Sequence, residues 1–138
     1  MKISTTVNFI DDLEYEGVNS SGNKVAIDMY DKNHKKALSP TELLLTSIAA
    51  CAMVDIAIML KKRKKIIESF RAETSGNRRE EHPRSFVDIH TNFIVVSPDV
   101  NDEEMKKVVD LAVEKYCSVA DTVKHGTDLT HSFEVHRS

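Results

Sequence analysis

The stretch Ser39–Lys65, SPTELLLTSIAACAMVDIAIMLKKRKK, decides how the rest of the chain must fold. It starts with helix signals: Ser39 can cap a helix, Pro40 suits the first helical position, and Glu42 completes a capping box. It ends in a run of cations, which the carboxyl end of a helix dipole favours. Residues 43–60 carry only four polar or weakly polar side chains, Thr46, Ser47, Cys51 and Asp55. A helix that is apolar on every side is either buried or spans a membrane.

A membrane-spanning helix is the first alternative. Residues 43–60 would rise about 27 Å as a helix, close to the thickness of the hydrocarbon core. Asp55 would then lie inside the bilayer at a cost of roughly 2.5–3.5 kcal/mol. The flanking segments also alternate like the strands of a globular domain. We therefore expect a buried core helix and no membrane span.

The length of 138 residues and the formal net charge of −3 set the broad class of protein. This length predicts a single domain over 1–138, and the charge gives no bulk attraction to nucleic acid. The first residues, MKISTTVNF, lack the apolar core of a signal peptide, so we expect a cytoplasmic protein. In a reducing compartment two cysteines are more often catalytic or redox-active than structural.

The segments on both sides of the helix alternate between polar and apolar residues, as strands do. Three strands precede the helix, at 2–9, 13–17 and 25–29, and two strands follow it, at 69–74 and 86–96. A second helix, amphipathic, is predicted from Asn101 or Asp102 to Tyr116, followed by a short helix at 119–124 and a last strand at 129–135. Strands and helices come in runs, which indicates the α+β class.

The predicted strands add up to one antiparallel sheet of about six strands. Such a sheet can cover only one side of a helix that is apolar all round, so the other side needs a partner. A homodimer in which two copies of the central helix pack together would meet this need.

Ser47, Cys51 and Asp55 share one face of the central helix because they stand four residues apart. The simplest interpretation is a core helix with a buried thiol. Cys117 falls at the junction of two predicted helices, where backbone N–H groups could favour a thiolate. His90 and His131 are expected to be ordinary residues on the sheet faces.

Two motifs together resemble the OsmC/Ohr family, the osmotically inducible and organic hydroperoxide resistance proteins. They are S-P-T-E-L-L-L-T-S-I-A-A-C at Ser39–Cys51 and A-V-E-K-Y-C-S-V-A at Ala112–Ala120. The resemblance implies an intertwined homodimer and a peroxiredoxin-like reduction of organic hydroperoxides in oxidative-stress defence. It also implies that Cys51 is the peroxidatic thiol and Cys117 the resolving one, with Ser47, Asp55 and Glu42 as possible supporting residues. No bound cofactor is implied; an external dithiol, lipoyl-linked in some branches, would reset the pair.

The sequence departs from the best-studied branch of that family at three places. That branch has an arginine near the reactive thiol, but here no arginine precedes Arg63. Its carboxylate partner is also missing, because Thr41 stands ten residues before Cys51 and Glu42 belongs to the capping box. Ser118 replaces the usual proline. The positive charge must come from other side chains, and the available ones are Lys2, Lys24, Lys32, Lys35, Lys36, His90, His125 and His131.

Three hypotheses for the function therefore stand. The first is a thiol peroxidase that acts on apolar hydroperoxides through Cys51 and Cys117. The second is a non-enzymatic redox or ligand-binding dimer on the same scaffold, and the third gives both cysteines a purely structural role in a protein that binds an apolar metabolite. The spacing of Cys51, Cys117, His125 and His131 matches no zinc finger, so no metal site is predicted.

Overall fold

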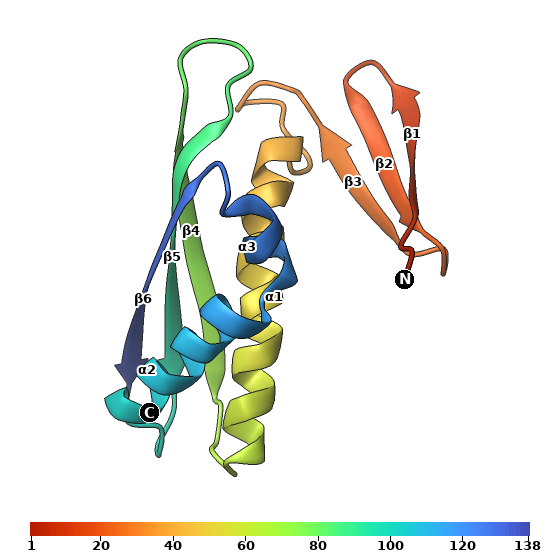
Figure 1. Ribbon diagram of the computed structural model, residues 1–138. Helices are drawn as coiled ribbons and strands as arrows, with labels where there is room; N and C mark the ends of the chain where they lie inside the picture. The colour runs from red at the N-terminus through yellow and green to blue at the C-terminus, as the bar shows by residue number, and fades with distance from the viewer. The chain divides into compact units, whose positions relative to one another are not determined.

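The structure is a computed structural model that describes residues 1–138 throughout. Its elements, shown in Figure 1, are β1 (Thr5–Asp11), β2 (Glu14–Asn19), β3 (Lys24–Asp28), α1 (Pro40–Lys62), β4 (Ser69–Arg78), β5 (Phe86–Val96), α2 (Asp102–Leu111), the π-helix η1 (Ala112–Tyr116), α3 (Ser118–Val123) and β6 (Asp128–His136). The α+β class and the predicted order of strands and helices are confirmed. The chain divides into two compact units, Met1–Leu44 and Leu45–Ser138. The assignment of a single domain to 1–138 stays a prediction.

The first unit holds the antiparallel sheet β1-β2-β3. The alternation predicted for β1 is present, but its apolar side chains are exposed within the chain: Val7 by 62% and Phe9 by 64%. The loop after β3 is organised by Asp28, which is 1% exposed. The Asp28 carboxylate accepts hydrogen bonds from Lys35 Nζ and from the backbone N–H groups of Lys36 and Ala37. This buried carboxylate fixes the path of the chain toward α1.

The second unit holds a separate three-stranded sheet, β4-β5-β6. Strands β4 and β5 form the predicted antiparallel hairpin, whereas β6 pairs with β5 in parallel. The expectation of one antiparallel sheet of six strands is thus corrected to two sheets of three. The parallel pairing arises because the chain crosses over through α2, η1 and α3 between β5 and β6, and a crossover connection joins parallel neighbours.

Helix α1 has the local signals that the sequence predicted. The backbone N–H of Ser39 donates to the Glu42 carboxylate at 2.8 Å, and the N–H of Glu42 lies 3.3 Å from Ser39 Oγ. The helix ends at Lys62 because Lys64 takes a left-handed conformation with φ 61°. The N–H of Lys65 then donates to the Leu60 carbonyl at 3.0 Å, as in a Schellman motif.

Only one side of α1 is buried within the chain. Its buried residues are Ile48, Ala49, Ala52, Ile56 and Leu60. On the opposite side Val54 is 59% exposed and Ile58 is 46% exposed. One-sided cover is what the sequence predicted for a single chain, and full burial of the helix in a homodimer stays a prediction. By length and composition alone α1 could also cross a membrane; its buried stripe packs as that of a core helix does.

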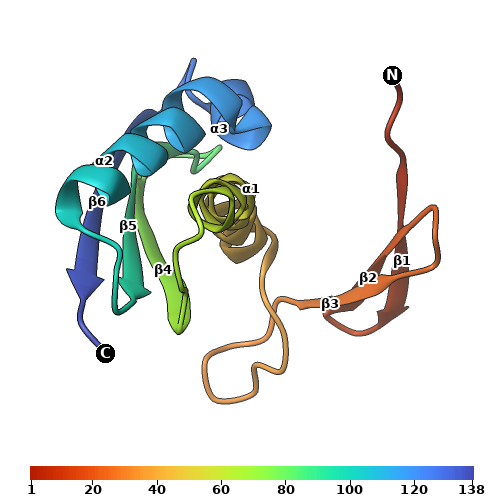
Figure 2. The same cartoon turned by 90° about the horizontal axis from the view of Figure 1, so that it is seen from below.

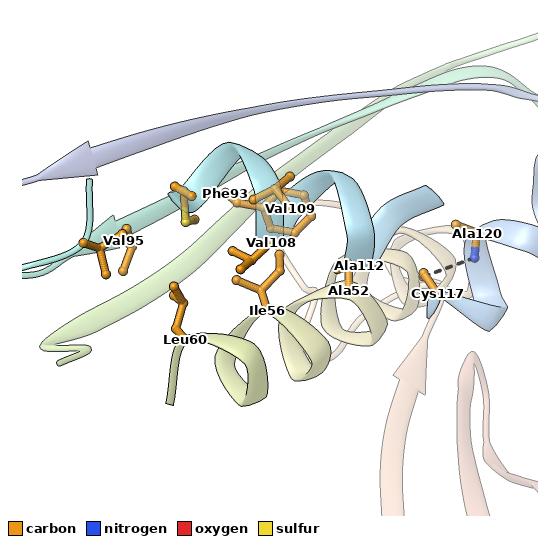
Figure 3. Close-up of a cluster of buried hydrophobic side chains, with 12 residues drawn as sticks. Ala52, Ile56, Leu60, Phe93, Val95, Val108, Val109, Ala112, Cys117 and Ala120 are labelled. Carbon is orange, nitrogen blue, oxygen red and sulfur yellow. Dashed lines mark hydrogen bonds between the residues drawn. The ribbon is translucent and has the colours of Figure 1, made fainter. Parts of the chain in front are cut away.

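Helices α1 and α2 lie on the same face of the sheet β4-β5-β6, as Figure 2 shows. The core between them contains Ile56 and Leu60 of α1, Val108 and Val109 of α2, and Phe93 of β5 (Figure 3). Asn101 caps α2 by accepting a hydrogen bond from the N–H of Glu104 at 2.8 Å. The predicted amphipathic helix is thus confirmed as far as Leu111, after which the chain widens into η1.

Candidate thiol site

Cys117 lies where η1 ends and α3 begins, and it is 3% exposed. Its backbone N–H donates to the Ala112 carbonyl at 2.8 Å, which closes the last turn of η1. Its Sγ accepts from the N–H of Ala120 at 3.4 Å, the contact drawn in Figure 3. Cys117 is therefore the residue that caps the short helix α3. The Cys117 thiol also lies 3.9 Å from the carbonyl oxygen of Ile48 on α1.

Burial is the main cause that raises the pKa of the Cys117 thiol, to about 11. The neighbouring thiol of Cys51 raises this pKa further, and the N–H of Ala120 opposes the rise. The expected backbone N–H contact is thus present, but it does not outweigh desolvation. At neutral pH Cys117 is a protonated thiol.

Cys51 is half-buried and packs against the hydrophobic core beside Ala52. Because the Cys117 thiol reaches the carbonyl of Ile48, less than one helical turn before Cys51, the two cysteines belong to one site. Both are free thiols. Their ability to form a disulfide stays a prediction.

The three expected supporting residues differ in their surroundings. Asp55 is half-buried and Ser47 is exposed, so the face they share with Cys51 lies at the edge of the buried stripe. Glu42 is held in the capping box, where the N–H and hydroxyl of Ser39 lower the pKa of its carboxyl group. Its local role is the one that the sequence predicts.

Two hollows meet at Cys117. The inner one is a cavity of about 20 Å³. The outer one is an open groove of about 340 Å³ that contains Glu114, Lys115, Asp121 and Lys124. Both are lined by Val113, Cys117, Ala120 and Leu129. The inner volume suffices for about one water molecule, whereas the groove has the size of a small-ligand pocket.

His131 of β6 lines the inner cavity together with Cys117. Its Nε2 lies 2.9 Å from Oδ1 of Asp110 on α2, and Oδ2 of Asp110 lies 2.6 Å from Nζ of Lys106. Sequence reasoning missed this pair and treated His131 as an ordinary residue on the sheet face. No local signal could have revealed it, because Asp110 does not belong to the apolar stripe of its helix and the contact depends on how β6 packs under α2.

Asp110, Glu114 and His131 are also the side chains best placed to hold a metal, since their potential ligand atoms lie within 4.8 Å of one another. Both carboxylate oxygens of Asp110 are, however, already engaged by Lys106 and His131. Asp110 is therefore part of a hydrogen-bond network with Lys106 and His131. His125, which the sequence analysis weighed as a ligand, is exposed and does not belong to it.

Four of the other proposed sources of positive charge have partners of their own. His90 is exposed on the sheet, as expected, and contacts Thr130 and Ser132. In the first unit Lys24 pairs with Glu16, Lys35 with Asp28, and Lys36 with Glu14. Within the second unit, His131 is the residue among them that lines the cavity of the thiol site.

Comparison with known proteins settles the family. A sequence model described as "OsmC-like protein" matches residues 33–132. The chain belongs to the OsmC-like family. A curated relative, Protein YhfA of Escherichia coli K12, is 34% identical over 129 residues, which cover 94% of this chain and 95% of YhfA.

Solved structures show the same OsmC-like fold. A hypothetical protein from Aquifex aeolicus VF5 is 30% identical and superposes with a TM-score of 0.87, covering 100% of this chain and 98% of its own. The organic hydroperoxide resistance protein OhrB of Bacillus subtilis is 17% identical with a TM-score of 0.64, covering 95% and 98% of the two chains. At that identity the likeness to OhrB concerns the fold alone.

Proposed function

We propose that this OsmC-like protein is a thiol peroxidase that reduces organic hydroperoxides with Cys51 and Cys117. The observation that carries the proposal is the meeting of two free thiols at one largely apolar site, on a fold shared with an organic hydroperoxide resistance protein. Cys117 is protonated at neutral pH, so the attacking thiolate must be the less buried Cys51. This assignment agrees with the roles that the two sequence motifs imply.

The cycle consumes one hydroperoxide and two thiols. The Cys51 thiolate attacks the terminal oxygen of the peroxide, the O–O bond breaks, and the alkoxide leaves as an alcohol after taking up a proton. Cys51 is then a sulfenic acid. Cys117 condenses with it to give a disulfide and water, and an external dithiol reduces the disulfide by thiol–disulfide exchange.

The groove beside Cys117 supports an apolar substrate. Val113, Ala120 and Leu129 provide apolar surface next to the sulfur. Such walls favour alkyl or aryl hydroperoxides over hydrogen peroxide, because burying an apolar group stabilises the complex by about 25 cal/mol per Å².

We propose further that the protein works as a homodimer in the cytoplasm. Val54 and Ile58 leave an apolar strip of α1 uncovered, and the β1 side chains Val7 and Phe9 are uncovered as well. Exposed apolar surface of this kind on two separate units is typical of an obligate interface. A second copy of the chain is the partner that these surfaces fit best.

The test is peroxide consumption by the reduced protein with cumene hydroperoxide, tert-butyl hydroperoxide and hydrogen peroxide, each with a small-molecule dithiol. We expect turnover to be fastest with the aryl substrate and absent in Cys51→Ser. Cys117→Ser should still react once but should not form the intramolecular disulfide. Wild-type protein that consumes none of the three peroxides would instead favour the non-enzymatic, ligand-binding alternative.

A further inference from the structure

We infer that His131, held by Asp110, is the general base that takes the proton from Cys117 when Cys117 condenses with oxidised Cys51. This inference rests on the peroxidase cycle proposed above. It assigns a catalytic group to a step for which the two cysteines alone provide none.

The condensation needs a base because the resolving sulfur must react as a thiolate. The pKa of Cys117 is raised to about 11, chiefly by burial. At pH 7 only about one molecule in 10⁴ would carry the Cys117 thiolate. The N–H of Ala120 contacts the sulfur without overcoming this penalty.

His131 is the side chain in the cavity that can accept a proton. The other residues that line the cavity with Cys117 are two threonines and six apolar residues, Thr91, Thr130, Ile48, Ala52, Phe93, Val113, Ala120 and Leu129. None of them titrates near neutral pH. The cavity also has room for about one water molecule, which can carry a proton between Cys117 and His131.

Asp110 sets the tautomer of His131. Its carboxyl pKa is lowered by Lys106 first and by His131 second, so it is ionised and can only accept hydrogen bonds. The contact of 2.9 Å therefore requires the hydrogen on Nε2 of His131. The neutral ring then has its lone pair on Nδ1, ready to accept a proton, and the Asp110 carboxylate stabilises the imidazolium that forms.

The other charged groups facing His131 come from the helices that cover it. Glu114 of η1 completes the cluster with Asp110, and Lys106 of α2 pairs with Asp110. Two carboxylates and one lysine therefore lie around the His131 ring.

The step is balanced in atoms and electrons. The bond between the two sulfurs forms as the S–O bond of the Cys51 sulfenic acid breaks. The sulfur of Cys51 is reduced and that of Cys117 is oxidised. The proton of Cys117 passes to His131 and then to the departing hydroxide, which leaves as water.

The experiment follows one turnover of the reduced protein with one equivalent of cumene hydroperoxide. Samples are quenched with alkylating reagent and acid, and mass spectrometry measures the disulfide and the dimedone-trapped Cys51 sulfenic acid. In His131→Gln we expect sulfenic acid to form at the wild-type rate and disulfide formation to be slower by about 10²-fold or more. Asp110→Asn should slow only the disulfide step, and less severely.

His90→Gln is the matched control, because His90 is also a histidine of the sheet β4-β5-β6 and also forms side-chain hydrogen bonds. Unlike His131, it is exposed and does not line the cavity. It should leave both rates unchanged. The pH profile separates catalysis from a structural role: the wild-type disulfide rate should reach a plateau well below the pKa of Cys117, because a side chain and not the solvent takes the proton. In His131→Gln it should rise about tenfold per pH unit toward the pKa of Cys117.

Disulfide formation at the wild-type rate in His131→Gln would overturn the inference. So would a wild-type rate that rises without a plateau up to pH 10, a result that does not depend on whether the variant folds. If wild-type protein forms no Cys51 sulfenic acid at all, the proposed peroxidase function fails. If His131→Gln forms the sulfenic acid and then the disulfide at wild-type rates, only the role of His131 fails.

Discussion

Cys117 accepts a backbone N–H at the start of a helix, which normally favours a thiolate, and yet the pKa of its thiol is raised. The sulfur caps α3 by accepting the N–H of Ala120, which by itself favours a thiolate. The surrounding core, in which the side chain is 3% exposed, has the larger effect. A sequence shows the cap but not the depth of burial, because the burial comes from α1 packing across the end of η1.

The protonated state of Cys117 leads to a prediction about its reactivity. In Cys51→Ser, alkylation of Cys117 at pH 7 should be at least 10²-fold slower than that of Cys51 in Cys117→Ser, because few Cys117 thiolates exist and the sulfur is buried. The rate with iodoacetamide, followed by mass spectrometry from pH 6 to 10.5, measures this. Equal rates in the folded variants would contradict it, and equal rates in urea serve as the control.

Asp28 should make the first unit sensitive to acid. The Lys35 ammonium, first among several causes, lowers the pKa of the Asp28 carboxyl group. Its stabilising contribution is therefore complete above the unfolded value of about 3.9 and is lost as the pH falls through the lower folded value. Asp28→Asn should lower the melting temperature at pH 7 and should have a much smaller effect at pH 2.

The exposed Asp11→Asn is the control for this measurement. A melting temperature of Asp28→Asn that equals the wild-type value at pH 7 would show that the Asp28 hydrogen bonds stabilise nothing. Sequence reasoning had no access to Asp28, because it appears there as one polar residue of an alternating strand.

Among the elements, α1 was the easiest to predict and the pairing of the strands the hardest. The start of α1 depends on Ser39 and Glu42, which are three residues apart, so the sequence contains the whole signal. The direction in which β6 pairs with β5 depends on the path of the chain through three helical segments. The alternating pattern of a strand is the same for parallel and antiparallel neighbours, so the pattern could not predict it.

The buried side of α1 should be far more sensitive to truncation than an exposed strand position. Ile56→Ala removes a side chain that is 0% exposed and leaves a cavity in the core, so we expect the free energy of unfolding to fall by about 2–5 kcal/mol. Val87→Ala on β5, where the side chain is 45% exposed, should cost about 1 kcal/mol or less. Urea unfolding followed by circular dichroism compares the two, and similar losses would contradict the assignment of the core.

At the scale of the whole molecule, the sequence anticipated a missing partner more clearly than the structure of one chain could. A helix that is apolar all round and a strand with an alternating apolar face both demand cover. In the single chain these surfaces remain at Val54, Ile58, Val7 and Phe9. The division of the six strands into two sheets could not be predicted from the apolar pattern. That pattern shows which face of a strand is apolar, but it does not show which strands pair with one another.

The homodimer is tested by its mass in solution. Light scattering at micromolar concentration should give about twice the chain mass of 15.6 kDa. Val54→Asp should shift the equilibrium toward monomer, because a carboxylate on the uncovered strip of α1 would be buried without a partner. Val87→Asp introduces the same charge on β5 and should leave the mass unchanged. A wild-type protein that stays monomeric at 100-fold higher concentration would refute the dimer.

The π-helix η1 has a consequence for how this site can change over time. A π-turn contains one residue more than an α-helical turn, and each helical residue turns the chain by about 100°. The extra residue in η1 (Ala112–Tyr116) therefore sets the direction around the helix axis in which Cys117 lies relative to the apolar stripe of α2. A single deletion there would leave α2 packed in place and rotate the second thiol out of register with the first. In descendants of this gene, the loss of one codon in this turn could end two-cysteine chemistry while both cysteines persist.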